Sequence, residues 1–123
     1  MNPITIGGVA PKNTRSSNEA VELVKEIHGR EDDFVEGDIE DRIYDHGPYS
    51  LKKIKLSDVD LDEFEIDTTY VDKIQKFIDK NKIYIPAIVY WSSDRVAIID
   101  GSHRLNAINN LGIKTVLAYV GKR

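Results

Sequence analysis

The 123-residue chain contains no cysteine, and its apolar runs are short. Without cysteine it has no disulfide framework, no thiolate nucleophile and no cysteine-based zinc or iron–sulfur site. No run approaches the roughly 18 apolar residues that a membrane-spanning helix needs, and the N-terminus lacks a charged start followed by an apolar stretch. These absences predict a soluble, non-secreted, cytoplasmic protein with no membrane partner.

The charges that are present are separated along the chain. Residues 31–72 hold 15 acidic and 4 basic residues, whereas residues 73–123 hold 3 acidic and 9 basic residues. The basic part suits an anionic ligand. The acidic segment 31–48 is a candidate docking surface for a protein partner, although charge runs more commonly lie in solvent. A pI near 5.3 disfavours non-specific DNA binding unless the basic part is displayed alone.

Hydrophobic periodicity predicts an α/β (α+β) fold, a small mixed sheet flanked by helices. Residues 1–16 show no period and are expected to form a loose arm, and residues 31–47 are expected to be mostly irregular. Ser17 is the expected cap of a first helix, and Thr69 with Asp72 forms a weak capping box for a second. Strands are expected at 49–56, 83–91 and 115–120, and Pro86 makes the second either an edge strand or a strand that starts at residue 86. A hairpin is expected through 92–99 and a last helix over 102–111.

The segment 98–108, IIDGSHRLNAI, is the most informative stretch because an apolar strand passes through a glycine turn into a helix. The first amides of a helix have no intrahelical partner and carry partial positive charge, so they attract anions. Gly101 lets the backbone approach a ligand closely, and Ser102 can cap the helix or donate its hydroxyl. His103 and Arg104 add donors and positive charge, so these four residues form the predicted phosphate-binding site.

Alternatives remain open for each of these side chains. Arg104 is unusual at a positive helix end, which a bound anion explains, but pairing with Asp100 explains it equally. His103 could act in catalysis or only hydrogen-bond a backbone carbonyl. Asp100 could act as a general base, hold a metal-bound water, or orient Arg104.

No metal site is predicted from histidine spacing, although Asp38, Glu40, Asp41 and Asp45 could supply ligands for a nucleotide's Mg²⁺ if they fold over the site. The aromatic residues Tyr84, Tyr90 and Trp91 could stack a base but more commonly pack in a core, and Lys52, Lys53, Lys55 and Lys114 are possible further phosphate contacts.

Four runs in this order resemble the ParB/sulfiredoxin-like superfamily, which includes ParB N-terminal and ParB-like nuclease domains. They are KIQKFID at 73–79, IPAIV at 85–89, IDGSHRLNA at 99–107 and LGIKTV at 111–116. The resemblance covers roughly residues 49–120 and divides the chain into an N-terminal arm, helix and acidic segment (1–48) and a ParB/sulfiredoxin-like domain (49–123). It implies that Gly101, Ser102, His103 and Arg104 bind nucleotide phosphates, with Asp100 at the edge of the site.

Members of that superfamily include CTP-binding partition proteins, ATP-using sulfiredoxins, free-serine kinases and reported nucleases. Ser102 stands where sulfiredoxins carry their reactive cysteine, so the resemblance does not extend to sulfinic-acid reduction. Because the sequence ends at Arg123, the helix-turn-helix and dimerisation regions of a partition protein are not expected.

The leading hypothesis is therefore a stand-alone module that binds a nucleotide, ATP or CTP with Mg²⁺, or another phosphate ligand. Turnover would be nucleotide hydrolysis or phosphoryl transfer, with Asp100 and His103 as candidate catalytic residues. The alternatives are a non-enzymatic protein-interaction or DNA-associated module of the phage or mobile-element type, and a ParB-like nuclease.

Overall fold

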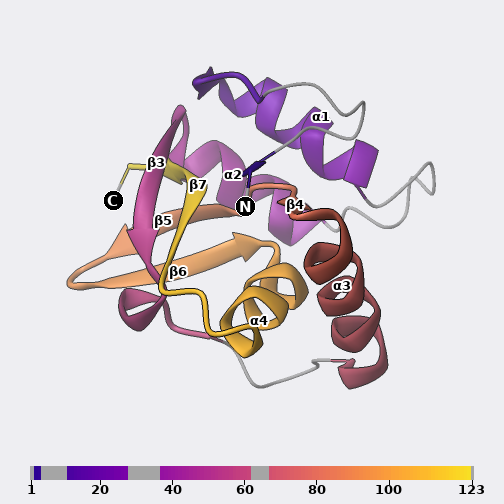
Figure 1. Cartoon of the computed structure of the whole chain (residues 1–123). Helices are drawn as coiled ribbons and strands as arrows, with labels where there is room; N and C mark the ends of the chain where they lie inside the picture. The colour runs from indigo at the N-terminus through magenta and orange to yellow at the C-terminus, as the bar shows by residue number, and fades with distance from the viewer. Residues whose placement is uncertain (1, 4–10, 28–36, 62–66, 123) are drawn as a thin grey trace.

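The computed structural model describes residues 2–3, 11–27, 37–61 and 67–122. These ranges contain both strands and helices (Figure 1). Their bounds are β1 (Asn2–Pro3), β2 (Thr14–Arg15), α1 (Ser17–Ile27), α2 (Gly37–His46), β3 (Tyr49–Lys55), the 3₁₀ turn η2 (Leu56–Asp58), α3 (Thr68–Asn81), β4 (Ile83–Tyr84), β5 (Ile88–Ser92), β6 (Arg95–Asp100), α4 (Ser102–Asn110) and β7 (Thr115–Gly121). None of the helices in these ranges is both long and apolar enough to cross a membrane.

The expected small mixed sheet is confirmed. Its five strands lie in the order β2-β3-β7-β5-β6. The β5–β7 pair is parallel and the other three pairs are antiparallel. A parallel pair needs a crossover between its strands, and β6 and α4 supply the chain that separates β5 from β7. The strands predicted at 49–56 and 115–120, the hairpin and the last helix all lie where the sequence placed them.

Helices cover both faces of this sheet, and each face has its own core. The first core joins α3 and α4 to the sheet, and the second joins α1 and α2 to the opposite face. Side chains alternate between the faces of a strand, so on β3 Tyr49 enters the second core and Ile54 the first. Figure 1 shows α1 and α2 above the sheet and α3 and α4 below it.

The start of α1 differs by one residue from the expectation. The cap is Ser16 and not Ser17, because the Glu19 amide donates to Ser16 Oγ at 3.2 Å. In return the Ser16 amide donates to Glu19 Oε1 at 3.1 Å. This reciprocal pair is a capping box, which pairs the cap with a glutamate three residues later and so selects Ser16 over Ser17.

The expectation of an irregular 31–47 segment is wrong for its second half, which forms α2. Ile43 is fully buried in the second core, and Arg42 Nη2 donates to the Ile98 carbonyl at 3.0 Å. Tertiary contacts with the sheet thus stabilise a helix that its acidic composition alone does not favour. Residues 31–36 lie outside the described part of the chain.

Two further details depart from the expected element ends. The cap of α3 is Asp67, whose carboxylate accepts from the amides of Thr69 and Tyr70 at 3.0 and 3.2 Å, rather than Thr69. The segment 83–91, in which a strand start at Pro86 was one expectation, is two strands, β4 and β5, and β5 starts at Ile88. Proline has no amide to donate to a sheet, which explains the interruption.

Parts of the expected N-terminal arm join the sheets. The β2 strand pairs with β3, and β1 pairs with β4 in a separate two-stranded sheet. The α1 and α2 helices share the second core with Tyr49, Ile88 and Tyr119 from the later strands. The domain division at residue 48 stays a prediction.

Candidate functional site

The turn between β6 and α4 requires glycine. Gly101 has φ +110°, and a Cβ there would lie 2.7 Å from Ala87 Cβ and 2.9 Å from Arg104 Nη2. Both the backbone conformation and the space exclude a side chain. Gly101 is itself the N-cap of α4, with no side-chain cap hydrogen bond, so the expectation that Ser102 caps the helix is wrong.

The first turn of α4 keeps its amide donors available. The first intrahelical bond runs from the Leu105 amide to the Gly101 carbonyl at 2.9 Å. Within the described residues, no hydrogen bond is formed by the amides of Ser102, His103 or Arg104. Three N–H groups at a helix start are the elements of an anion site.

Arg104 points inward and is held by the protein itself. Its side chain is 11% exposed, and Nε donates to the Ile85 carbonyl at 3.0 Å. Nη2 lies 3.5 Å from the Pro86 carbonyl and 3.4 Å from Asp100 Oδ2. The pairing with Asp100 is thus the alternative that the structure shows, and it accounts for a cation at the positive end of α4. Nη1 has no hydrogen-bond partner among the described residues, so it can still donate to a ligand.

Asp100 ends β6 as a buried carboxylate, 7% exposed. The strand is interrupted around Pro86, and the carbonyls of residues 85 and 86 there face Arg104. The Arg104 guanidinium thus links α4 to the segment between β4 and β5 and to Asp100 at the end of β6. In this geometry Asp100 orients Arg104.

His103 connects the starts of two helices. Its Nε2 accepts from the Asp67 amide at 3.2 Å, and its ring meets the Tyr70 ring edge-on with centroids 5.1 Å apart. Because Nε2 accepts this hydrogen bond, Nδ1 is the ring nitrogen that is left to donate to a ligand. Asp67 and Tyr70 were not anticipated as neighbours of the site, since only the packing of α3 against α4 brings them there.

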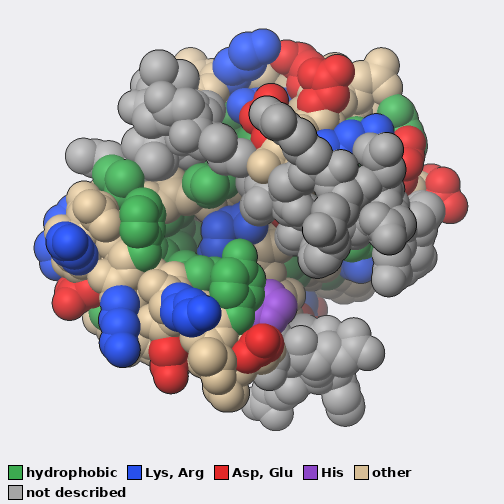
Figure 2. All heavy atoms as spheres, turned by 90° about the vertical axis from the view of Figure 1, so that its right-hand side faces the viewer, with side chains coloured by type: hydrophobic (Ala, Val, Ile, Leu, Met, Phe, Trp, Pro, Cys, Tyr) green, Lys and Arg blue, Asp and Glu red, His purple; other side chains and the backbone are tan. Residues whose placement is uncertain are grey.

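The exposed face of α3 beside His103 carries aromatic and basic side chains. Tyr70 and Phe77 are 49% and 52% exposed, and Lys73 and Lys80 are exposed one turn after each. Figure 2 faces the side of the molecule that bears α3 and shows hydrophobic, basic and acidic side chains interspersed on it. The surface next to the α4 start therefore offers an exposed aromatic ring and lysines, together with the acidic residues Asp67 and Asp72.

Other predicted contributors lie elsewhere. Glu40, Asp41 and Asp45 are on α2, which covers the opposite face of the sheet from α4, and the side chain of Asp38 is outside the described set. In the described ranges no three His, Asp or Glu residues are grouped as a metal site would need.

The aromatic candidates are engaged in packing. Tyr84 is buried, and its hydroxyl accepts from the Leu117 amide at 2.9 Å. Tyr90 stacks on His46 with ring centroids 3.6 Å apart, and Trp91 packs against the first core.

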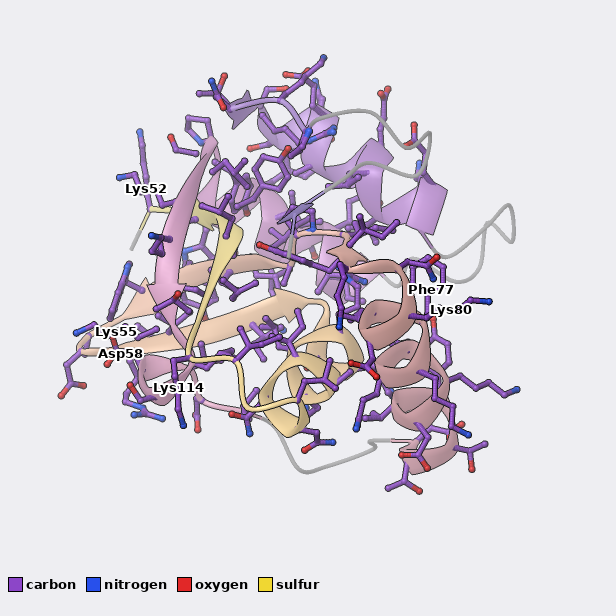
Figure 3. All side chains as sticks on the ribbon, in the orientation of Figure 1. Lys52, Lys55, Asp58, Phe77, Lys80 and Lys114 are labelled. Carbon is purple, nitrogen blue, oxygen red and sulfur yellow. The ribbon has the colours of Figure 1, made fainter. Side chains whose placement is uncertain are left out.

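The candidate lysines are also remote from the α4 start. Lys52, Lys53 and Lys55 lie on β3, and Lys114 follows the C-terminal end of α4. Figure 3 shows Lys52, Lys55 and Lys114 on the opposite side of the molecule from α3, where Phe77 and Lys80 are labelled. These lysines do not contribute to the α4 start.

No known family model matches the chain. No curated protein matches it either.

Solved structures do match the fold. A sulfiredoxin from Arabidopsis thaliana aligns with a TM-score of 0.52 and 18% identity over 59% of this chain and 85% of the other. A conserved hypothetical protein from Pyrococcus furiosus aligns with a TM-score of 0.52 and 19% identity over 57% of this chain and 31% of the other. A Pnob8-like ParB-N domain aligns with a TM-score of 0.48 and 18% identity over 61% of this chain and 30% of the other. The chain thus spans under a third of the length of the last two. The alignment with the sulfiredoxin shows that the described part of the chain has a sulfiredoxin-like fold.

Proposed function

We propose that the chain binds a phosphate-bearing ligand, a nucleoside triphosphate such as ATP or CTP, at the first turn of α4. The observation that carries this proposal is the set of three amides, of residues 102–104, that have no partner in the described chain. Gly101 provides the left-handed turn that starts α4 at this point, and Nη1 of Arg104 and Nδ1 of His103 supply two more donors. Backbone amides and a guanidinium together are a common phosphate site.

Tyr70 extends the proposed site toward a base. Its half-exposed ring adjoins His103, which brings an aromatic surface to the edge of the phosphate site. Stacking of a base on such a ring contributes about 1–3 kcal/mol and tolerates different bases. Lys73 is exposed one helical turn further along α3 and adds positive charge. We place Mg²⁺ on the triphosphate itself, because Mg²⁺ bound to nucleotides keeps several waters and needs few protein carboxylates.

Turnover by hydrolysis or phosphoryl transfer is part of the same proposal, and it assigns Asp100 a positioning role. Asp100 holds Arg104, which would neutralise charge on the transferred phosphoryl group. His103 would donate a hydrogen bond from Nδ1 to a phosphate oxygen. Release of inorganic phosphate from ATP or CTP measures this activity directly, and Asp100→Asn is expected to lower the rate more than it weakens binding.

A charge placed at the α4 start tests the binding proposal. Ser102→Asp puts a carboxylate beside the free amides of the first turn. The negative charge interacts favourably with the helix dipole, but it repels a phosphate group. Calorimetric titration with Mg·ATP and Mg·CTP is expected to show at least about tenfold weaker binding for this variant, while its thermal stability is unchanged or higher. Asn110→Asp is the matched control, since it makes the same charge change at the exposed far end of α4. Equal affinities for both variants and the native chain would refute the site.

A second candidate function is a protein-interaction module that uses α2. Asp41 and Asp45 are exposed on α2, and Tyr44 between them is 48% exposed. An acidic surface with an exposed aromatic ring suits a basic protein partner. Thermal-shift measurements that show no stabilisation by any nucleotide, together with a complex lost on Tyr44→Ala, would favour this function over the first.

A further inference from the structure

One end of β7 lacks a strand partner on the side of β5. The parallel pairing begins at Ile88 opposite Tyr119, so residues 115–118 of β7 pair only with β3. The Leu117 amide on that open side donates to the Tyr84 hydroxyl at 2.9 Å instead of to a strand. A cavity of about 300 Å³ lies here, lined by Lys53, Tyr84, Ile113, Thr115, Val116 and Leu117.

The lining combines an apolar wall with a few polar groups. Ile113, Val116 and Leu117 supply the apolar wall. The Tyr84 hydroxyl is occupied as an acceptor, and its own proton has no acceptor among the described residues. Burial raises the pKa of Tyr84, so the hydroxyl stays protonated at neutral pH and can donate. Lys53 supplies an exposed ammonium group at the same cavity.

The surroundings of the cavity carry net positive charge. Lys55 is the register partner of Thr115, and Lys114 is its chain neighbour. Neither of them, nor Lys53, forms an ion pair with a described residue. Figure 3 shows Lys55 and Lys114 on the same side of the molecule, with Asp58 as the labelled acidic residue there. The ammonium groups of Lys53, Lys55 and Lys114 make the cavity mouth attractive to an anion.

We propose that this cavity binds a small amphipathic carboxylate. The apolar body of the ligand packs against Ile113, Val116 and Leu117. Its carboxylate lies between the Lys53 ammonium group and the Tyr84 hydroxyl, which donates to it. A cavity of half this volume accommodates benzene, so the expected ligand has roughly ten to fifteen non-hydrogen atoms. The cavity adjoins the C-terminal end of α4, one helix length of about 13 Å from the first turn. It is therefore a second site, independent of the proposed phosphate site.

The test uses 4-phenylbutyrate as the probe and the full chain labelled with ¹⁵N. Titration is expected to give saturable amide shifts at Thr115 and Leu117 and none at residues 102–104. The uncharged alcohol 4-phenylbutanol is expected to bind at least about fivefold more weakly, because it lacks the carboxylate that pairs with Lys53.

Two lysine variants test whether the positive charge of Lys53 itself contributes to binding of 4-phenylbutyrate. Lys53→Gln is expected to raise the Kd for 4-phenylbutyrate about fivefold, and both variants should fold because both side chains are exposed. Lys52→Gln is the matched control, since Lys52 directly precedes Lys53 on β3, points to the other face of the sheet and does not line the cavity. It should leave the Kd within about twofold. Absence of saturable shifts at Thr115 and Leu117, or equal effects of the two variants, would overturn the proposal whether or not a nucleotide binds elsewhere.

Discussion

Replacing Arg104 with alanine should destabilise the fold as well as any ligand site. The guanidinium joins three groups that are distant along the chain or buried: the Ile85 and Pro86 carbonyls and Asp100. The Nε contact at 3.0 Å is the strongest, and the two Nη2 contacts at 3.5 and 3.4 Å are at the outer limit of hydrogen bonding. Removing the cation also leaves the 7% exposed Asp100 without this partner. Breaking a buried pair costs about 3–5 kcal/mol, and the long contacts place the expected loss near about 3 kcal/mol.

Urea unfolding followed by Trp91 fluorescence and far-UV circular dichroism measures this loss. Arg104→Lys keeps the charge but loses the planar fork, so it should cost roughly 1–2 kcal/mol. Asp100→Asn retains an acceptor and should cost about 1 kcal/mol, with a coupling to Arg104→Ala of about 1 kcal/mol in a double-mutant cycle. Nucleotide affinity is therefore best compared between the native chain and Arg104→Lys, which keeps more of the fold.

A loss below about 1 kcal/mol for Arg104→Ala would refute this reasoning, because a guanidinium held by two carbonyls and a buried carboxylate cannot be removed so cheaply. Zero coupling between the Asp100 and Arg104 substitutions would show that the pair does not interact in solution.

Further predictions concern single local features. Gly101→Ala should lower stability by at least about 2 kcal/mol in the same unfolding assay, because the left-handed backbone and the contact with Ala87 both oppose a Cβ. Asp67→Ala should cost about 1 kcal/mol by removing the cap of α3, whereas Asp67→Asn, which keeps a capping oxygen, should cost less. The hydrogen bond from Lys12 is the main cause that lowers the pKa of Glu19 to about 2. A depressed carboxyl pKa stabilises the fold above the ordinary value of 4.5 and this contribution is lost as pH falls toward 2, so an NMR acid titration should show Glu19 protonating in that window and not at 4.5. Lys12→Gln should return the midpoint toward 4.5.

Local sequence signals predicted most of the fold because the later elements obey their own periodicity. The strand pattern ending at Asp100, the obligatory glycine after it and the apolar spacing of the last helix lie together in the chain, and the structure builds them as expected. For the first helix, only the predicted cap residue was wrong. Ser16 and Ser17 are adjacent in the sequence, and only the reciprocal hydrogen bonds with Glu19 identify Ser16 as the cap.

Features that depend on distant contacts were not predictable in the same way. The α2 helix gains its stability from burying Ile43 against strands that follow it in sequence. The direction of Arg104 depends on carbonyls 18 and 19 residues earlier, which the strand interruption at Pro86 exposes. The contact of His103 with the α3 start spans 36 residues. The hydrophobic periodicity of a single segment cannot predict such contacts between residues that are distant in the sequence.

An amide-resolved titration tests the central claim that the α4 start binds phosphate. The ¹⁵N-labelled chain is titrated with Mg·ATP and Mg·CTP, with adenosine and cytidine as controls that lack phosphate. The account predicts saturable shifts of the Ser102, His103 and Arg104 amides with the triphosphates and much smaller shifts with the nucleosides. Unshifted amides at these three residues under saturating triphosphate would contradict it.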